Sequence, residues 1–119
     1  MKLLIVDDSQ IIRKAIGAYL GKMNLEVAGQ AGDGEEALRL FRETRPEAVT
    51  MDITMPGMDG LECMRHILEI NPDTRVLVIT ALNDNLTAVK ALNSGARGFL
   101  GKPFTQAGLA EAVQKLLED

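Results

Sequence analysis

Short runs of hydrophobic residues alternate along this chain with stretches whose hydrophobic residues recur every three or four positions. The first run, Leu3–Val6, is continuously apolar, whereas the apolar residues that follow it fall at helical spacing. Continuous runs are typical of strands buried on both faces, and the wider spacing indicates amphipathic helices. Gly, Pro, Asn or Asp lies near each change of pattern, where turns are expected. The pattern therefore predicts five strands that alternate with five helices.

Each expected strand is short and precedes one helix. The expected strands are Leu3–Val6, Leu25–Gly29, Ala48–Met51, Val76–Ile79 and Gly98–Leu100. The apolar stripes of the five helices are marked in turn by Ile12 to Leu20, Ala37 to Phe41, Leu61 to Leu68, Leu86 with Val89 and Leu92, and Leu109 to Leu117. Apolar strands separated by helices imply a parallel sheet that is covered on both faces and joined by right-handed crossovers. We therefore expect a single domain, residues 1–119, with a doubly wound α/β fold.

Composition and charge narrow the classes of function. The chain is 46% hydrophobic and 25% charged, as in ordinary globular proteins, and no apolar run approaches the roughly 18 residues of a membrane span. Its net charge of −4 disfavours a nonspecific nucleic-acid surface. Cys63 is the only cysteine, which excludes an intrachain disulfide, and two acids follow the first apolar run too early for a signal peptide. We expect a cytoplasmic protein without direct nucleic-acid binding or membrane insertion.

Polar side chains stand at the ends of four of the five expected strands. Asp7 and Asp8 follow the first strand, Asp52 the third and Thr80 the fourth, while Lys102 comes soon after the fifth. Taken singly, each has an ordinary role as a helix cap, a strand former or a solvated charge. However, the carboxyl ends of parallel strands share one edge, where doubly wound folds bind their ligands. Taken together, the five residues predict a binding crevice at that edge.

Three neighbouring carboxylates repel one another, and a hard divalent cation would neutralise them. Mg²⁺ fits best because it prefers oxygen ligands and commonly bridges carboxylates to a phosphoryl group. Zinc is disfavoured, since His66 and Cys63 are expected in the third helix, away from this edge. A carboxylate can itself accept a phosphoryl group when a metal and a cation offset the charge. Asp52, at the end of the expected central strand, is the predicted phosphoacceptor.

Four segments of the chain resemble the receiver domains of two-component response regulators, and most closely the CheY-type chemotaxis proteins. These segments are LLIVDDS at 3–9, TMDITMPGMDG at 50–60, VITA at 78–81 and GFLGKPF at 98–104. The DDS-x-x-x-R pattern that ends at Arg13 also resembles the chemotaxis type. The resemblance covers essentially the whole chain. It implies a flavodoxin-like (βα)5 sandwich with a five-stranded parallel sheet of order 2-1-3-4-5.

The resemblance also implies roles for the residues at the strand ends. Asp8, Asp52 and the backbone carbonyl of Thr54 would ligate Mg²⁺, and Asp7 would act mainly through bound water. Asp52 would take a phosphoryl group from the phosphohistidine of a sensor histidine kinase of the CheA type. Lys102 would then pair with the phosphoryl oxygens.

Two further residues would convert phosphorylation into a change of surface. The Thr80 hydroxyl would move to hydrogen-bond a phosphoryl oxygen, and the Phe99 ring would turn into the vacated space, altering the face of the fourth helix, fifth strand and fifth helix. The family also implies a cis bond between Lys102 and Pro103, which only proline tolerates readily. Leu82 matches a position that flanks the approaching water. Because it offers no polar group, we expect a relatively long-lived phosphoryl form.

We therefore expect a phosphorylation-activated switch that catalyses only its own phosphorylation and slow autodephosphorylation, and not a metabolic enzyme. The expected partners are the kinase, a downstream protein such as a flagellar motor switch protein, and a phosphatase. The unphosphorylated protein is expected to be a monomer. The sequence leaves open which kinase, target and phosphatase these are, and whether the receiver is free-standing or cut from a longer regulator.

Three other functions fit parts of the pattern. A Mg²⁺-dependent phosphatase with an aspartyl nucleophile usually has a D-x-D motif and a larger substrate-binding domain, whereas the acids here are adjacent. A flavodoxin-like electron carrier shares the fold, but three Phe, one Tyr and no Trp offer little for flavin recognition. A receiver that has lost phosphorylation is disfavoured because all five site residues are retained. The signalling switch remains the preferred interpretation.

Overall fold

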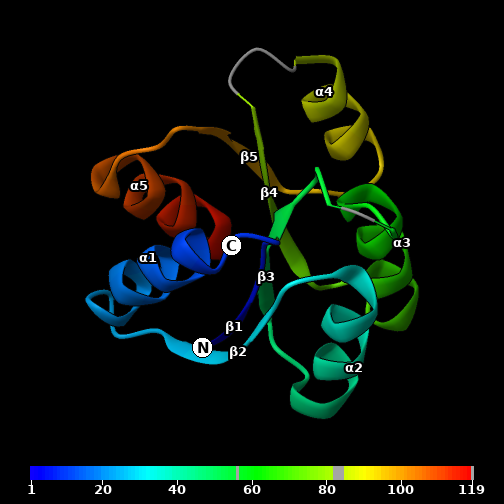
Figure 1. The fold of residues 1–119 in the computed structure, drawn as a ribbon, viewed down its shortest axis with the longest axis horizontal. Coiled ribbons are helices and arrows are strands. Elements are labelled where there is room, and N and C mark those ends of the chain that lie inside the picture. The colour runs from blue at the N-terminus through cyan, green and yellow to red at the C-terminus, as the bar shows by residue number, and fades with distance from the viewer. Residues whose placement is uncertain (56, 82–84, 119) are drawn as a thin grey trace.

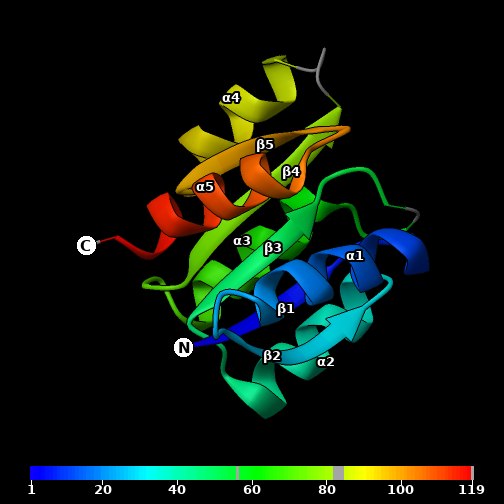
Figure 2. The same cartoon turned by 90° about the vertical axis from the view of Figure 1, so that its left-hand side faces the viewer.

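The strands and helices alternate strictly along the chain. The computed structural model describes residues 1–55, 57–81 and 85–118. Within these ranges the elements are β1 (Lys2–Val6), α1 (Gln10–Gly21), β2 (Glu26–Ala31), α2 (Gly34–Thr44), β3 (Ala48–Asp52), α3 (Gly60–Ile70), β4 (Arg75–Ala81), α4 (Asn85–Asn93), β5 (Gly98–Lys102) and α5 (Gln106–Leu117). All neighbouring strands pair in parallel, in the order β2-β1-β3-β4-β5 (Figure 2). The predicted doubly wound α/β fold and its strand order are confirmed.

Helices cover both faces of the sheet and bury two hydrophobic layers. In Figure 1, α1 and α5 lie on one side of the strands, and α2, α3 and α4 lie on the other. Because successive side chains of a strand point to opposite faces, Leu3 and Ile5 of β1 join the layer under α1 and α5. Leu4 and Val6 join the opposite layer, where Phe41 of α2 is buried. The inner strands are thus apolar on both faces, as the continuous runs predicted.

Four helices begin with a polar cap that lies in the loop after a strand. The N-caps of α1, α2, α3 and α5 are Ser9, Asp33, Asp59 and Thr105, and each side chain accepts a hydrogen bond from a backbone N–H in the first turn. Such bonds satisfy donors that a helix start leaves free. Since each cap follows a strand, these helix starts share the sheet edge at which the strands end. That edge therefore gathers loops, caps and the polar strand-end residues.

The α4 helix forms where the apolar spacing predicted it, but it buries a different side. Leu86, Val89 and Leu92 are 79%, 52% and 40% exposed, whereas Ala88 and Ala91 are 4% and 0% exposed. Small side chains allow the helix backbone to lie close to the sheet, so the alanines make the contact and the larger residues stay outside. The predicted apolar stripe of this helix is therefore wrong as a core-facing surface.

Both chain ends lie at the amino edge of the sheet, opposite the loops that carry the caps (Figure 2). The end of α5 is tied there by Arg75, the first residue of β4, whose guanidinium donates to the carbonyls of Leu116 and Leu117. None of the described helices is long and apolar enough to cross a membrane.

Candidate functional site

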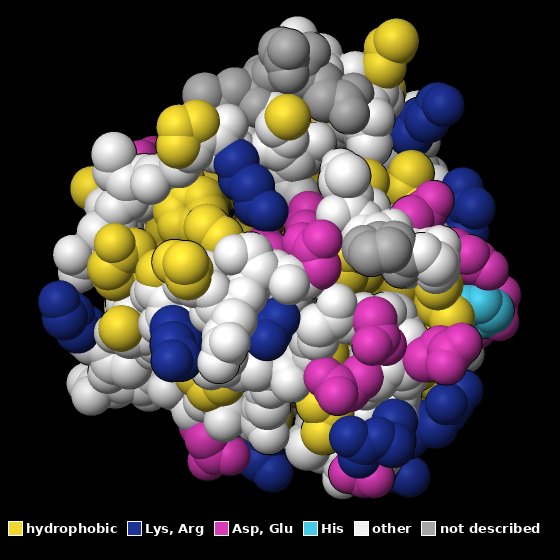
Figure 3. Space-filling model, in the orientation of Figure 1, with side chains coloured by type: hydrophobic (Ala, Val, Ile, Leu, Met, Phe, Trp, Pro, Cys, Tyr) yellow, Lys and Arg dark blue, Asp and Glu magenta, His cyan; other side chains and the backbone are white. Residues whose placement is uncertain are grey.

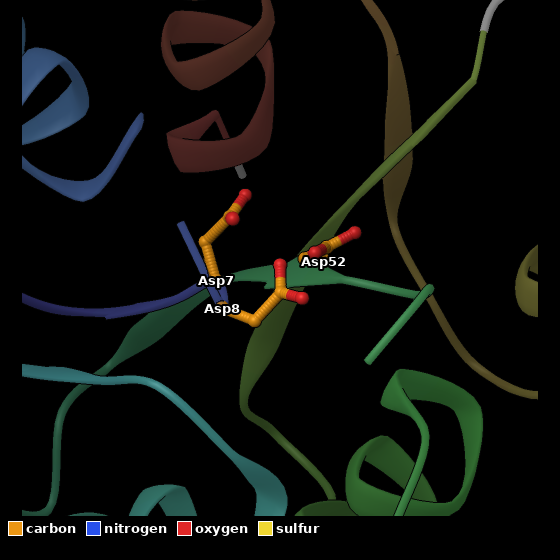
Figure 4. A group of neighbouring side chains, drawn as sticks. All are labelled: Asp7, Asp8 and Asp52. Atoms are coloured by element: carbon orange, nitrogen blue, oxygen red, sulfur yellow. The ribbon is translucent and has the colours of Figure 1, made fainter. Parts of the chain in front are cut away.

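Two neighbouring strands bring three carboxylates together at the carboxyl edge of the sheet. Asp7 and Asp8 directly follow β1, and Asp52 is the last residue of β3. One carboxylate oxygen from each lies within 4.8 Å of the others (Figure 4). Asp7 is fully buried and Asp52 is 3% exposed, whereas Asp8 is exposed. The cluster is therefore reached from solvent on the side of Asp8.

Lys102, the last residue of β5, extends past the end of β4 to the acidic cluster. Its Nζ lies 2.9 Å from Oδ2 of Asp7 and 3.6 Å from Oδ1 of Asp52. The peptide bond from Lys102 to Pro103 is cis, as the resemblance implied. One ammonium group faces three carboxylates, so two negative charges stay uncompensated when all the groups are ionised. This excess favours a further cation at the cluster.

The pKa values of Asp52 and Lys102 are both raised, but burial causes the rise for Asp52 and opposes it for Lys102. Burial raises the pKa of Asp52 to about 6 and the charge of Asp7 adds to the rise, while Lys102 and the backbone N–H of Thr54 oppose it. That N–H donates to Oδ1 of Asp52 at 3.2 Å. Burial alone would lower the pKa of Lys102, but its hydrogen bond to Asp7 and the charges of Asp52 and Asp7 outweigh burial and raise it. At neutral pH the lysine is cationic and Asp52 is mostly ionised.

Thr80 brings a buried hydroxyl to the same edge without a partner for it. Thr80 is 4% exposed, and its Oγ1 has no hydrogen-bond partner among the described residues. It follows Ile79, the residue of β4 that is paired with Asp52. Buried hydroxyl groups are normally hydrogen-bonded because leaving one unpaired costs free energy. A ligand oxygen at this edge would give the Thr80 hydroxyl its missing partner.

The other predicted residues lie at different distances from the cluster. Phe99 lies on β5 and is 51% exposed. Leu82 lies outside the described residues. His66 and Cys63 both lie on α3, and neither joins the acidic cluster found among the described residues. Cys63 is buried, its thiol donates to the carbonyl of Gly34, and burial raises its pKa to about 12. Both residues thus lie on the third helix, where the sequence placed them.

Two residues that support the cluster had no role assigned from the sequence. A Cβ at Gly60, the first residue of α3, would lie 2.2 Å from the backbone oxygen of Asp52 and 2.6 Å from Cα of Ile53, so only glycine fits there. Its N–H donates to the carbonyl of Ile53 at 2.9 Å, which closes the loop after β3. Arg13 of α1 donates from Nη1 to the backbone carbonyl of Asp7. The available signals were the second glycine of PGMDG and the arginine of DDS-x-x-x-R.

The surface around the cluster combines charge with an apolar groove. Figure 3 shows acidic side chains beside a basic one near the middle of this face, with a hydrophobic patch next to them over α1 and α5. A groove of about 350 Å³ there is lined by Ile12, Ala15, Tyr19, Lys102, Pro103 and Phe104. A larger cleft, about 470 Å³, lies between the ends of α2 and α3 and includes none of the strand-end residues. The groove beside Lys102 is thus the cavity that adjoins the cluster.

Fold and site together define a flavodoxin-like α/β domain whose carboxyl edge holds an aspartate cluster and a lysine. A sequence model of the response regulator receiver domain matches residues 3–114. The chain belongs to this family, as its motifs predicted. Receiver domains are phosphoacceptor signalling domains of two-component systems and not classical enzymes.

Relatives and solved structures agree with this assignment. The chain is 36% identical over 115 residues to the chemotaxis protein CheY of Thermotoga maritima, covering 97% of this chain and 96% of that protein. It is 40% identical over 117 residues to the response regulator GacA of Pseudomonas syringae, covering 98% of this chain and 53% of that protein. In the crystal structure of the CheX-CheY-BeF3-Mg²⁺ complex from Borrelia burgdorferi, one chain superposes with a TM-score of 0.95 at 32% identity, covering 100% of this chain and 90% of that chain.

Proposed function

We propose that residues 1–119 form a single receiver domain in which Asp52 accepts a phosphoryl group from the phosphohistidine of a sensor histidine kinase. The observation that carries this proposal is the setting of Asp52 itself. It is an almost fully buried carboxylate at the end of a central strand, 3.6 Å from the Lys102 ammonium and clustered with Asp7 and Asp8. Burying and clustering carboxylates in this way costs free energy that a bound cation or ligand would offset.

The donor set suits Mg²⁺ as the cofactor. The three carboxylates offer oxygen ligands within 4.8 Å of one another, and Lys102 leaves two of their charges uncompensated. Asp8, Asp52 and the Thr54 carbonyl would hold the ion directly, with Asp7 acting mainly through bound water. When bound, Mg²⁺ supplies positive charge that offsets the repulsion between the carboxylates and the phosphoryl oxygens.

Asp52 and Lys102 would take part in both the phosphoryl transfer and the later hydrolysis of the phosphoryl group. A carboxylate oxygen of Asp52 forms a bond to phosphorus while the bond from phosphorus to the imidazole nitrogen breaks. The imidazole leaves with that electron pair and is protonated from solvent. Lys102 moves its ion pair from Asp52 to the phosphoryl oxygens and stays cationic. In autodephosphorylation, a water oxygen bonds to phosphorus while the bond from phosphorus to the Asp52 oxygen breaks; the carboxylate keeps that electron pair, the water proton passes to solvent, and inorganic phosphate is released.

The same site would control a surface for a partner. The unpaired Thr80 hydroxyl gains an acceptor when it approaches the phosphoryl group, and the half-exposed Phe99 ring turns into the space that Thr80 leaves. Because the phosphoryl group contacts this arrangement better, phosphorylation shifts the population toward it. The face made of α4, β5 and α5 then changes. Its exposed Leu86 and Val89 offer apolar contact area to a protein partner.

Similarity to CheY proteins supports a role in chemotaxis, with a CheA-like kinase upstream and a flagellar motor switch protein as the candidate target. The groove beside Lys102 offers the kinase, or a phosphatase, a docking surface next to Asp52. We propose that the unphosphorylated switch is monomeric, and we place it in the cytoplasm, where its lone cysteine would stay reduced. The chain also matches 53% of the length of GacA, which supports a second arrangement in which this receiver domain is one part of a longer regulator.

Intact mass after incubation with acetyl phosphate tests the phosphoacceptor. The wild-type protein, an Asp52→Asn variant and an Asp73→Asn variant are compared with Mg²⁺ and with a chelator. Asp73 is an exposed acid near the opposite edge of the sheet and serves as the matched control. We expect one phosphoryl adduct on the wild type and on Asp73→Asn, only with Mg²⁺, and none on Asp52→Asn. An equal adduct on Asp52→Asn, or no adduct on the wild type, would overturn the proposal.

A further inference from the structure

We propose that Arg13 is a positioning residue that holds the peptide between Asp7 and Asp8, and with it both carboxylates, in the orientation that a divalent cation needs. The inference rests on the proposed function, because it concerns the same acidic cluster. Helix α1 contributes none of the clustered acids, but through Arg13 it would influence their geometry directly.

The Asp7 carbonyl lies just beyond the hydrogen-bonded part of β1. The last register pair of β1 and β2 is Val6 with Ala31, and the Asp7 N–H still donates to the Ala31 carbonyl at 3.0 Å. β2 ends at Ala31, and in a continued parallel ladder the next donor to the Asp7 carbonyl would be the N–H of Asp33. Asp33 instead caps α2, and among the described residues no backbone N–H donates to the Asp7 carbonyl. Nη1 of Arg13 donates to this carbonyl instead. The carbonyl is thereby paired, as buried carbonyls nearly always are.

This hydrogen bond acts on two acids at once. A peptide unit is planar, so the Asp7 carbonyl lies in one plane with the Asp8 nitrogen and with both Cα atoms. When Arg13 holds that oxygen, it restrains the rotation of this peptide plane about the Asp7 Cα–C bond and the Asp8 N–Cα bond, and so limits how the backbone presents both side chains. The Asp7 carboxylate has further restraints, because Oδ1 accepts from the Ser9 N–H at 2.9 Å and Oδ2 pairs with Lys102. Among the described residues, the Asp8 carboxylate accepts no such bond, so its direction depends most on the backbone.

The β2–α2 loop leaves room for the guanidinium at this place. A Cβ added to Gly32 would lie 3.2 Å from Nη1 of Arg13, which is tighter than ordinary van der Waals contact. The absence of a side chain at position 32 thus lets Arg13 reach the Asp7 carbonyl. An alanine at position 32 would require the guanidinium to shift by a few tenths of an ångström while leaving the charge of Arg13 in place.

A purely electrostatic role and a positioning role of Arg13 predict opposite changes in Mg²⁺ affinity when Arg13 is removed. If Arg13 influenced the cluster only through its positive charge, removing that charge would make Mg²⁺ bind more tightly. If Arg13 orients the two acids, removing it would weaken Mg²⁺ binding, as for other residues that hold metal ligands in place. The sign of the change therefore separates positioning from electrostatics.

Calorimetric Mg²⁺ titration of the full chain provides the test, with the thermal midpoint measured beside it. The variants are Arg13→Met, Arg13→Lys and Gly32→Ala. Lys14→Met is the matched control, because it removes the same charge from the next residue of α1, which is exposed and does not contact Asp7. We expect Arg13→Met to raise the Kd for Mg²⁺ by at least about 10-fold. Arg13→Lys should recover part of the loss, Gly32→Ala should weaken binding in the same direction, and Lys14→Met should leave the Kd unchanged.

Each possible outcome decides the inference. An unchanged or lower Kd for Arg13→Met would overturn it, and a lower thermal midpoint at an unchanged Kd would show that Arg13 serves stability alone. If Arg13→Met does not fold, Gly32→Ala decides, and unchanged Mg²⁺ binding in that variant would reject the positioning role. Wild-type protein that binds no Mg²⁺ would overturn the proposed function as well. If the wild type binds Mg²⁺ and Arg13→Met binds it with the same Kd, only the positioning role of Arg13 is overturned.

Discussion

Replacing Asp52 with asparagine should stabilise the metal-free protein at neutral pH, and the gain should grow as pH rises. Asparagine has nearly the same shape as aspartate, but it cannot ionise. In the wild type, burial and the nearby Asp7 charge raise the pKa of Asp52 from its ordinary 3.8 to about 6. The folded state therefore holds a proton on Asp52 over a range of pH in which the unfolded chain has already released it.

The direction and size of the effect follow from this difference in proton binding. A raised carboxyl pKa stabilises the folded state fully below about 3.8, and this stability is lost as pH rises through about 6. The two pKa values together correspond to about 3 kcal/mol between fully protonated and fully ionised Asp52. Slightly more than half of that cost is already present at pH 5, so about 1 kcal/mol or a little more should separate pH 5 from pH 8. This cost is a net value that already includes the favourable charge of Lys102, and asparagine avoids it.

Urea unfolding of the wild type and Asp52→Asn at pH 5 and pH 8, in a chelator, measures the effect. We expect the unfolding free energy of Asp52→Asn to exceed that of the wild type, by about 1 kcal/mol more at pH 8 than at pH 5. Asp73→Asn is the control and should show no comparable pH-dependent gain. Saturating Mg²⁺ should narrow the gap at pH 8, because the wild type has one more ligand for it. A gap that stays constant with pH, or a less stable variant at pH 8, would refute the reasoning.

Three further substitutions test contacts around the sheet by urea unfolding. Gly60→Ala should cost about 3 kcal/mol or more, because a Cβ there would lie 2.2 Å from the Asp52 carbonyl oxygen; a loss below 1 kcal/mol would contradict that close approach. Thr50→Val should raise the unfolding free energy by about 1 kcal/mol, since the fully buried Thr50 hydroxyl has no partner among the described residues; a loss of stability would show that it is paired. Leu86→Ser should change stability by less than about 0.5 kcal/mol because Leu86 is 79% exposed, and a larger loss would mean that it packs in the core.

The sheet and the residues at its edge could be predicted because periodicity and strand ends are local properties of the sequence. Short, mainly apolar runs indicated all five strands, although the second, predicted at Leu25–Gly29, extends from Glu26 to Ala31. Once the sheet was taken to be parallel, its geometry brought Asp7, Asp52 and Lys102 to one edge without knowledge of any contact. The structure brings these three together as predicted.

The features that could not be predicted depend on close contacts between distant segments. Apolar spacing on α4 does not reveal which side lies against the sheet, because Ala88 and Ala91 also fall at helical spacing and allow the closer approach. The meeting of Gly60 with the Asp52 backbone requires knowledge of how the loop after β3 returns. The bond from Arg13 to the Asp7 carbonyl likewise depends on β2 ending at Ala31, before Asp33 could donate to that carbonyl.

The charged groups of the site belong to parts of the sheet with unequal resistance to local opening. Asp7 and Asp52 extend from the inner strands β1 and β3, whereas Lys102 ends β5, an edge strand paired only with β4. Edge elements with fewer buried contacts open more often than inner strands. Each opening of β5 would withdraw the ammonium and leave the carboxylates in place. Amide hydrogen exchange along β5 therefore reports how often the acidic cluster loses the Lys102 ammonium while the rest of the sheet stays folded.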